Sequence, residues 1–237
     1  MRAAFAFLAY PFRARDCEKP RGLKIARDLG VIARSSALVC FVMFSLCPGV
    51  TQAQQKQPQT QQKSQQTEDQ LRQAVQNGDR AALERLTMRA ENGVVAAQYW
   101  LGVLYATGQG VPKNTALAAR WFRRGAERGD AASQNNLAGM YANGEGGPRD
   151  LKEAFIWFRK AAEQGYGPAQ RNLGGMYRDG EGVDRDLVLA YLWFNLAAEQ
   201  GIESASKSRD KLEIQMTNEQ IVEARKLSKY WKPSNAK

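Results

Sequence analysis

A period of 36 residues organises the chain from residue 94 to residue 201. Shifting the sequence by that length brings three copies of one pattern into register, and 20 of 36 positions are identical between 130–165 and 166–201. Such a period marks a unit that cannot bury its apolar face alone and stacks on its neighbours, which predicts a helical solenoid with an extended surface. The recurring residues are Gln98/Gln134/Gln170, Leu101/Leu137/Leu173, Tyr105/Tyr141/Tyr177, Gly108/Gly144/Gly180, Gly110/Gly146/Gly182, Ala118/Ala154/Ala190, Trp121/Trp157/Trp193, Phe122/Phe158/Phe194, Ala126/Ala162/Ala198 and Gly129/Gly165/Gly201.

The second half of each copy has the spacing of one face of a helix. Ala118, Trp121, Phe122 and Ala126 stand at positions i, i+3, i+4 and i+8. A short polar residue precedes this face and can accept hydrogen bonds from the first free N–H groups, and a glycine that can close the helix follows it. These flanking residues are Asn114, Asp150 and Asp186 before the face, and Gly129, Gly165 and Gly201 after it.

The first half of each copy also predicts a helix, with Gln98, Leu101, Gly102 and Tyr105 on one face. A Gly-x-Gly sequence separates the two helices and is typical of a turn that needs positive φ. Small residues at 102, 138 and 174 leave room for a large ring, and the candidates for that place are Trp121, Trp157 and Trp193. We expect Trp157, in the central copy, to be enclosed by two neighbouring units.

These residues together resemble the Sel-1-like repeat, a relative of the tetratricopeptide repeat with a slightly longer period. The resemblance covers residues 94–201, as three repeats at 94–129, 130–165 and 166–201. It implies an all-α fold, a right-handed α/α superhelix or solenoid of helix-turn-helix repeats. It also implies an adaptor for protein complexes, and it implies no reaction.

Residues 68–93 look like a degenerate leading repeat. Ala82, Ala90 and Gly93 keep the phase of the full copies, whereas Arg85 and Leu86 stand where Trp and Phe are found in them. The N-terminal helix pair of the array is therefore expected to start before the first full copy.

Residues 202–237 break the period and are interpreted as C-terminal capping helices. Residues 203–214 can form one helix, and Thr217 with Gln220 has the spacing of a capping box at the start of another. Terminal units of a repeat array need a polar outer face to stay soluble, and the lysines and arginines of this segment fit that role.

The N-terminal segment has the order of features of a secretory signal peptide. A long basic region precedes the apolar run ALVCFVMFSL at 37–46, and Thr51-Gln52-Ala53 has the small-x-small character of a cleavage site. We therefore expect residues 1–53 to be a signal peptide, with an uncleaved anchor and a cytosolic protein as the alternatives. The glutamine-rich stretch 54–67 is predicted to be a disordered linker.

Composition narrows the function classes. The chain has no histidine, and its three cysteines, Cys17, Cys40 and Cys47, all lie in the expected signal peptide. A mature protein without either residue excludes a cysteine nucleophile, a disulfide framework, a histidine-based triad and the usual kind of zinc site. We predict no catalytic residue, no metal and no cofactor.

The net charge of +10 does not by itself indicate nucleic-acid binding. Eight of the 34 Lys and Arg residues but only three of the 24 Asp and Glu residues precede residue 54, so the mature part carries +5. Its basic residues are mixed with acidic ones, which is typical of an ordinary solvated surface.

Two patterns suggest catalysis at first sight. Gly108-x-Gly110 resembles part of a phosphate loop, but no strand precedes it and no Lys-Ser/Thr follows it. Acid pairs such as Glu181 with Asp184, or Glu145 with Asp150, have the residue types of glycoside chemistry, yet they fall in turns and helix starts. We interpret both patterns as turn and cap geometry.

A binding surface is expected where the copies differ on the first helix of each repeat, away from the packing face. In related solenoids these helices line the concave side. Together the variable positions would form a groove that runs from aromatic to basic and amide-rich, suited to an extended peptide. The alternatives are ordinary surface residues and, for Trp100, packing against the leading repeat. The predicted partner-binding residues are Tyr99, Trp100, Asn135, Asn136, Arg171, Asn172 and Arg178.

The sequence therefore predicts an exported, non-enzymatic scaffold that binds a partner protein or peptide in a bacterial periplasm, or after secretion. It predicts no nucleic-acid partner, and contact with a membrane only through an uncleaved signal segment. The alternatives are an enzyme of the cell wall, an antibiotic-hydrolysing enzyme, and a secreted factor that binds a host protein.

Overall fold

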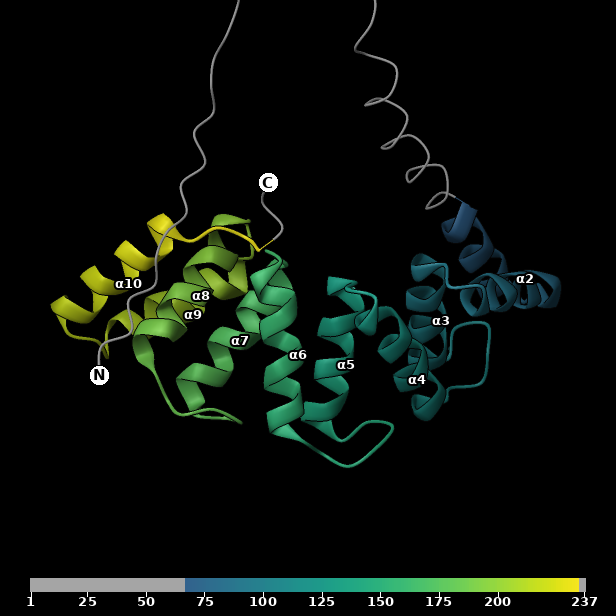
Figure 1. Ribbon diagram of the computed structural model, residues 1–237, viewed down its shortest axis with the longest axis horizontal. Helices are drawn as coiled ribbons and strands as arrows, with labels where there is room; N and C mark the ends of the chain where they lie inside the picture. The colour runs from purple at the N-terminus through teal and green to yellow at the C-terminus, as the bar shows by residue number, and fades with distance from the viewer. Residues whose placement is uncertain (1–66, 235–237) are drawn as a thin grey trace, which may run out of the picture. The chain divides into compact units, whose positions relative to one another are not determined.

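The computed structural model describes residues 67–234, which form an all-α solenoid (Figure 1). A helical segment at 67–76 precedes α2, and none of the described helices is long and apolar enough to cross a membrane. The expected signal peptide, and the linker except for its last residue, lie outside the described residues. The labelled helices are α2 (Arg80–Glu91), α3 (Val95–Thr107), α4 (Thr115–Glu127), α5 (Ala131–Asn143), α6 (Leu151–Glu163), α7 (Gly167–Asp179), α8 (Leu187–Glu199), α9 (Glu203–Glu213) and α10 (Asn218–Tyr230).

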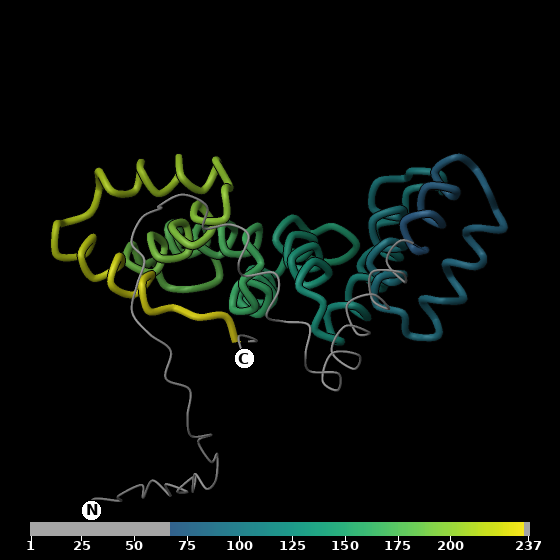
Figure 2. Tube along the Cα trace, turned by 90° about the horizontal axis from the view of Figure 1, so that it is seen from above, coloured from purple at the N-terminus to yellow at the C-terminus, as the bar shows by residue number. Residues whose placement is uncertain are grey.

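From α2 to α9, helices that follow one another in the sequence also lie side by side (Figure 2). Within each repeat α3 packs against α4, α5 against α6 and α7 against α8. Between repeats the second helix of one unit packs against the first helix of the next, as α4 does against α5. Each unit therefore stacks on its immediate neighbours, which is the arrangement that defines a solenoid.

Side-chain caps start the second helix of every repeat, as the sequence predicts. The carboxylate of Asp150 accepts hydrogen bonds from the N–H groups of Lys152 and Glu153, both at 3.0 Å. Asn114 and Asp186 cap α4 and α8 in the same way. These bonds satisfy N–H groups that have no partner inside the helix.

The second glycine of the Gly-x-Gly turn is needed for two reasons. Gly146 and Gly182 have φ values of 76° and 72°, which favour glycine. A Cβ atom on Gly146 would also lie 2.5 Å from the carbonyl oxygen of Thr115, and one on Gly182 would lie 2.6 Å from the carbonyl carbon of Leu151. The turn of each repeat thus packs against the start of the second helix in the preceding repeat, at Thr115 of α4 and Leu151 of α6.

Phenylalanine, and not tryptophan, occupies the space beside the small residues of the first helices. A Cβ atom on Gly102 would lie 2.6 Å from the ring of Phe122, and one on Gly174 would lie 2.8 Å from the ring of Phe194. The prediction of a tryptophan in this place is wrong. Adjacent residues of a helix point about 100° apart around its axis. The phenylalanine that follows each tryptophan therefore faces the first helix of its own repeat, and the tryptophan does not.

Tryptophan instead packs toward the preceding unit. Trp157 contacts the apolar cluster around Phe158 and also the cluster around Phe122, but it is only half-buried. The Nζ atom of Lys160 lies 4.1 Å from the centre of its ring. Trp157 therefore contacts residues of more than one repeat, as expected. The expectation that these contacts enclose its ring is wrong, because the side chain is only half-buried.

A buried glutamine ties each repeat to the one before it. The side-chain amides of Gln98, Gln134 and Gln170 donate hydrogen bonds to backbone carbonyls near the end of the preceding second helix, at 2.9, 3.1 and 3.2 Å. A buried amide must be hydrogen-bonded to avoid a large desolvation cost, so these bonds fix the register of the stacked units. The accepting carbonyls belong to Ala90, Ala126 and Ala162.

The C-terminal helices end the array in a different geometry. Thr217 and Gln220 form the predicted capping box at the start of α10. α10 packs against α8, so it does not repeat the pairing of two helices within one unit. Because α7, α9 and α10 all contact α8, this helix is buried on almost every side and carries apolar residues throughout.

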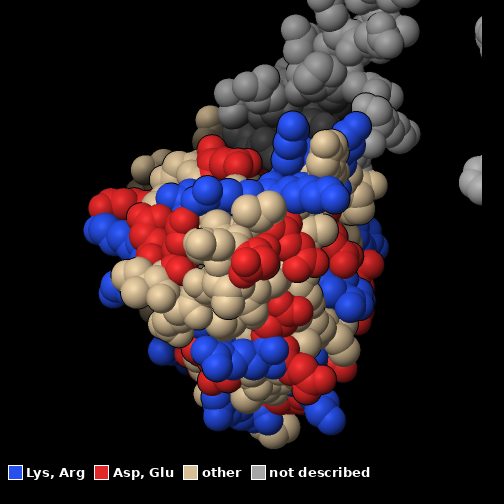
Figure 3. Space-filling view, turned by 90° about the vertical axis from the view of Figure 1, so that its left-hand side faces the viewer, with Lys and Arg blue, Asp and Glu red and all other residues tan. Residues whose placement is uncertain are grey.

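The outer face of this end carries both charged and apolar side chains. Figure 3 shows basic, acidic and uncharged side chains interleaved there, with no single sign of charge dominating. Ile214, Val222 and Tyr230 are 86%, 66% and 69% exposed. The expected charged residues are present on the cap, and exposed apolar side chains such as Val222 and Tyr230 of α10 lie among them.

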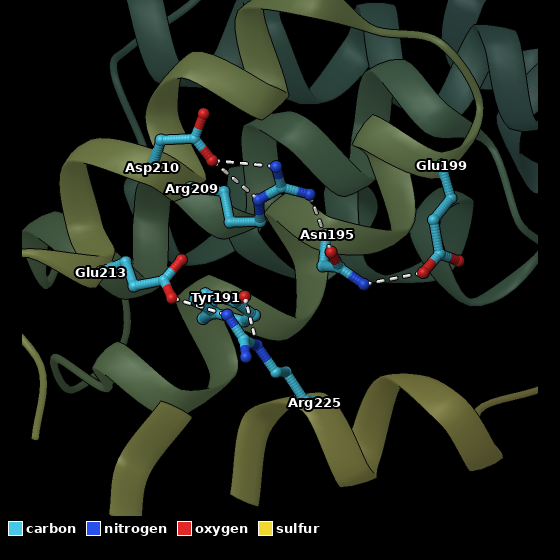
Figure 4. Close-up of polar contacts among 7 residues, drawn as sticks. All are labelled: Tyr191, Asn195, Glu199, Arg209, Asp210, Glu213 and Arg225. Carbon is cyan, nitrogen blue, oxygen red and sulfur yellow. Dashed lines mark hydrogen bonds and ion pairs between the residues drawn. The ribbon is translucent and has the colours of Figure 1, made fainter. Parts of the chain in front are cut away.

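Polar contacts join α8, α9 and α10 (Figure 4). The guanidinium of Arg225 on α10 donates to the hydroxyl of Tyr191 at 3.1 Å and to the carboxylate of Glu213 at 2.6 Å. Arg209 donates to the side chain of Asn195 at 3.0 Å. These contacts hold α9 and α10 against α8 at positions where the repeat pattern no longer specifies the packing.

Candidate functional site

The first helices of the three repeats line a continuous groove. A hollow of about 440 Å³ lies between α3 and α5, and a second of about 390 Å³ lies between α5 and α7. Gly139, Asn143 and Asn172 line both hollows, so the two are continuous. We refer to their combined surface as the groove.

Six of the seven predicted partner-binding residues line this groove. The structure places Tyr99, Asn135, Asn136 and Asn172 around the first hollow, and Arg171, Asn172 and Arg178 around the second. Residues from three separate repeats are therefore brought to one surface, because the 36-residue period repeats the same helix face.

Trp100 lies elsewhere. Its ring packs against the apolar cluster of the leading repeat, and the guanidinium of Arg72 lies 4.5 Å from the ring centre. This is the alternative considered for Trp100 from the sequence. Its neighbour Tyr99, whose ring lies 4.8 Å from that of Trp100 in an edge-on arrangement, lines the groove instead.

Tyr99 forms an aromatic wall at the α3 end. Its ring lies 6.1 Å from that of Phe122, and it belongs to the cluster that includes Leu137 and Met140. Burial raises the pKa of the Tyr99 phenol, and a hydrogen bond with Asn136 partly opposes that shift. The phenol is thus neutral at ordinary pH and can offer both an apolar face and a hydroxyl to a ligand.

Asparagine side chains connect the middle of the groove to its α7 end. Asn172 donates a hydrogen bond to the side chain of Asn135 at 3.0 Å, and the guanidinium of Arg171 donates to the oxygen of Asn172 at 3.0 Å. Each amide still has donor or acceptor capacity, because an amide group has two N–H donors and an oxygen with two lone pairs. A row of this kind can hydrogen-bond the backbone of an extended peptide.

The charges at the α7 end are balanced. Arg178 donates to both carboxylate oxygens of Asp179, at 2.8 and 2.5 Å, and its guanidinium lies 5.9 Å from the ring of Phe194. This pairing raises the pKa of Arg178 and lowers that of Asp179. With Arg171 and Glu181 also on the lining, the second hollow has two cationic and two anionic groups, so the predicted basic end is neutral overall.

The groove includes residues that the sequence analysis did not select. Asn143 and Asp179 occupy equivalent positions on α5 and α7 and line the hollows. They stand one helical turn beyond Gly139 and Gly175, on the same face, and differ between copies. Continuing the variable face by one turn would have identified them.

The acidic side chains near this surface were considered above as catalytic pairs. In the stretch 67–234, no group of three or more His, Cys, Asp and Glu side chains is placed to hold a metal ion. Asp150 caps α6, and the exposed carboxylates of Glu145 and Glu181 contact Asn143 and Arg149. Three of the four acids considered for glycoside chemistry, Glu145, Asp150 and Glu181, therefore have structural contacts of their own.

Comparison with known proteins identifies the repeat. The family model described as Sel1 repeat matches residues 95–130, 131–166 and 167–202. The chain is similar to a Sel1 repeat protein from Oxalobacter formigenes of known crystal structure, with 40% identity and a TM-score of 0.50 over 54% of this chain and 97% of that one.

A second solved structure is described as a protective antigen, c5321, present in uropathogenic Escherichia coli strains and displaying an SLR fold. It is 33% identical, with a TM-score of 0.49, over 63% of this chain and 40% of that one. A search among curated proteins gave no match. Sel1 repeat proteins typically mediate protein–protein interactions as non-enzymatic scaffolds. With three matched repeats, and a relative covered over almost its whole length, the chain belongs to the Sel1 repeat family.

Proposed function

We propose that the protein is an exported adaptor that binds an extended segment of a partner protein in the groove. The observation that carries this proposal is the continuity of the two hollows, which share Asn172 and present side chains from α3, α5 and α7. An aromatic wall, a row of amides and a charge-balanced end favour a peptide held by its backbone over a strongly charged ligand. Extended segments bound along solenoid surfaces are recognised in this way.

The groove is tested by the double variant Arg171→Ala/Arg178→Ala. Both side chains line the groove at the surface, and truncation of each should change the free energy of unfolding by about 0.5 kcal/mol or less. If the two arginines anchor a partner, their loss should weaken its binding by about 2 kcal/mol or more. Binding is measured by affinity capture from a periplasmic extract, with quantification of the captured protein.

A matched control removes the same charge elsewhere. Arg120 on α4 and Lys152 on α6 are exposed and lie outside the groove lining, so Arg120→Ala/Lys152→Ala should capture the partner as the wild type does. Retention of the partner by the groove variant at wild-type levels would remove the groove from consideration.

Export is a separate part of the proposal. The order of basic region, apolar run and small-x-small sequence supports cleavage near Gln54. A reporter fused after Lys237 should appear outside the cytoplasm, and the intact mass of the native protein should correspond to a start at or near Gln54. A mass that retains residues 36–50 would instead indicate an uncleaved anchor.

A further inference from the structure

An extended segment follows α10 and docks on the repeats. After α10, residues 231–234, which we call the tail, cross α8 toward the end of α6 (Figure 1). The ring of Trp231 lies 5.9 Å from that of Trp193 at an interplanar angle of 76°. Pro233 lies 3.5 Å from the place that a Cβ on Gly165 would occupy, and the N–H of Ser234 donates to the carbonyl of Glu163 at 2.8 Å. The array therefore binds an extended Trp-x-Pro segment of its own chain.

The residues that receive the tail belong to the repeat pattern. Trp193, Gly165 and the carbonyl of Glu163 form what we call the tail site. The same residue types recur 36 positions earlier at Trp157, Gly129 and Glu127, which we call the middle site. They recur again at Trp121, Gly93 and Glu91, which we call the first site. The chain thus contains three versions of one surface, all outside the groove lining.

The first site is closed by a side chain of the array. Arg128 donates a hydrogen bond to the carbonyl of Gly93 at 2.9 Å and covers this glycine. The residues equivalent to Arg128 are Gln164 and Gln200, and they point inward to donate to Gln134 and Gln170 at 2.7 Å. They therefore leave the glycines of the other two sites accessible.

The middle site is accessible. No atom of the described chain lies within 4 Å of the place that a Cβ on Gly129 would occupy, whereas at the tail site Pro233 lies 3.5 Å from the equivalent position on Gly165. Among the hydrogen bonds of residues 67–234, none is accepted by the carbonyl of Glu127. A carbonyl in the last turn of a helix has no partner inside that helix and is free to accept an N–H from elsewhere.

The middle site and the tail site differ in the residue one turn after the tryptophan. Leu196, buried at 6% exposure, follows Trp193 by one turn, while Lys160 follows Trp157 and lies over its ring. An exposed lysine on an aromatic ring is held weakly and can swing into solvent. Lys160 therefore shields the ring in the free protein without blocking it permanently.

We propose that the middle site binds an extended segment of a partner protein in which a tryptophan is followed two positions later by a proline. The tryptophan ring would lie against Trp157, the proline against Gly129, and the next N–H would donate to the carbonyl of Glu127. The tail supplies the template for each of these contacts. This recognition combines an aromatic anchor, a proline that stiffens the extended backbone and one main-chain hydrogen bond.

The probe for this site is an N-acetylated synthetic peptide with the sequence of residues 230–237, titrated into the full chain by calorimetry. One peptide should bind per chain, and a peptide with alanine in place of its tryptophan should not bind. Trp157→Ala should weaken binding at least tenfold, whereas Trp121→Ala, at the site closed by Arg128, should leave it unchanged. Circular dichroism verifies that each variant is folded.

Lys160→Leu is the decisive variant, because it gives the middle site the leucine of the tail site. It should tighten peptide binding about tenfold by adding apolar surface beside Trp157. The absence of peptide binding to Lys160→Leu would overturn the proposal. Binding that is unchanged in Trp157→Ala but lost in Trp193→Ala would also overturn it, since the peptide would then have replaced the tail at the tail site.

Discussion

Replacing Phe158 with alanine is expected to lower the free energy of unfolding by about 3–5 kcal/mol. The Phe158 side chain is 5% exposed and packs in a cluster with Ala138, Leu173 and Met176. Its removal would lose the burial of the ring and leave a cavity between helices of the central repeat. Urea denaturation followed by circular dichroism measures the change.

Trp157→Ala is the matched comparison because the two aromatic residues are adjacent. Trp157 is half-buried, so its truncation should cost less, about 1–3 kcal/mol. A loss for Trp157→Ala that equals or exceeds that for Phe158→Ala would show that the assignment of phenylalanine to the core and tryptophan to the interface between units is wrong.

Gly182→Ala is the second change with a large expected effect, and it should cost about 2–5 kcal/mol. At φ 72° an L-residue is strained by about 1–2 kcal/mol, and the new Cβ would also collide with the carbonyl group of Leu151, adding about 1–3 kcal/mol. Because that carbonyl is backbone at the start of α6, the collision can be relieved only by moving one repeat relative to the next. Thermal or urea unfolding measures the loss.

Gly201→Ala isolates the strain from the collision. Gly201 has φ 83°, but no atom lies within 4 Å of its would-be Cβ. This variant should lose only about 1–2 kcal/mol. Equal losses for the two variants would mean that the contact between the Gly-x-Gly turn and the preceding repeat contributes nothing to stability.

The features predicted correctly from the sequence are those that depend on local chemistry repeated three times. Asp150 caps its helix, and the glycine turns have positive φ, because these requirements act within a few residues. The placement of tryptophan beside the small residues of the first helices was wrong. Two adjacent large apolar residues, such as Trp157 and Phe158, both fit the helical period, and only the position of the partner helix separates them.

The sequence predicted the position of the groove, but it did not predict the charge at the α7 end of the groove. The variable face of the first helices brought Tyr99, Asn135 and Arg171 to one surface, as a common helix phase requires. The pairing of Arg178 with Asp179 depends on rotamers and was not visible, so the charge of the α7 end was misjudged.

The C-terminal end was the hardest part to predict. After residue 201 the 36-residue period no longer constrains the packing, and the docking of α10 on α8 depends on contacts between distant residues, such as Arg225 with Tyr191. The position of the tail was equally hard to predict, because Trp231 contacts Trp193 only when α10 directs the chain back along the array.

The buried glutamines also explain how such an array can lengthen. Each repeat carries a donor, such as Gln134, at its start and an acceptor, such as the carbonyl of Ala162, near its end. Duplication of one 36-residue segment therefore supplies both halves of the new interface at once, without a compensating substitution elsewhere. A gene encoding this chain can gain or lose a whole unit, and with it a length of binding surface, in a single step that preserves the glutamine–carbonyl hydrogen bonds between repeats.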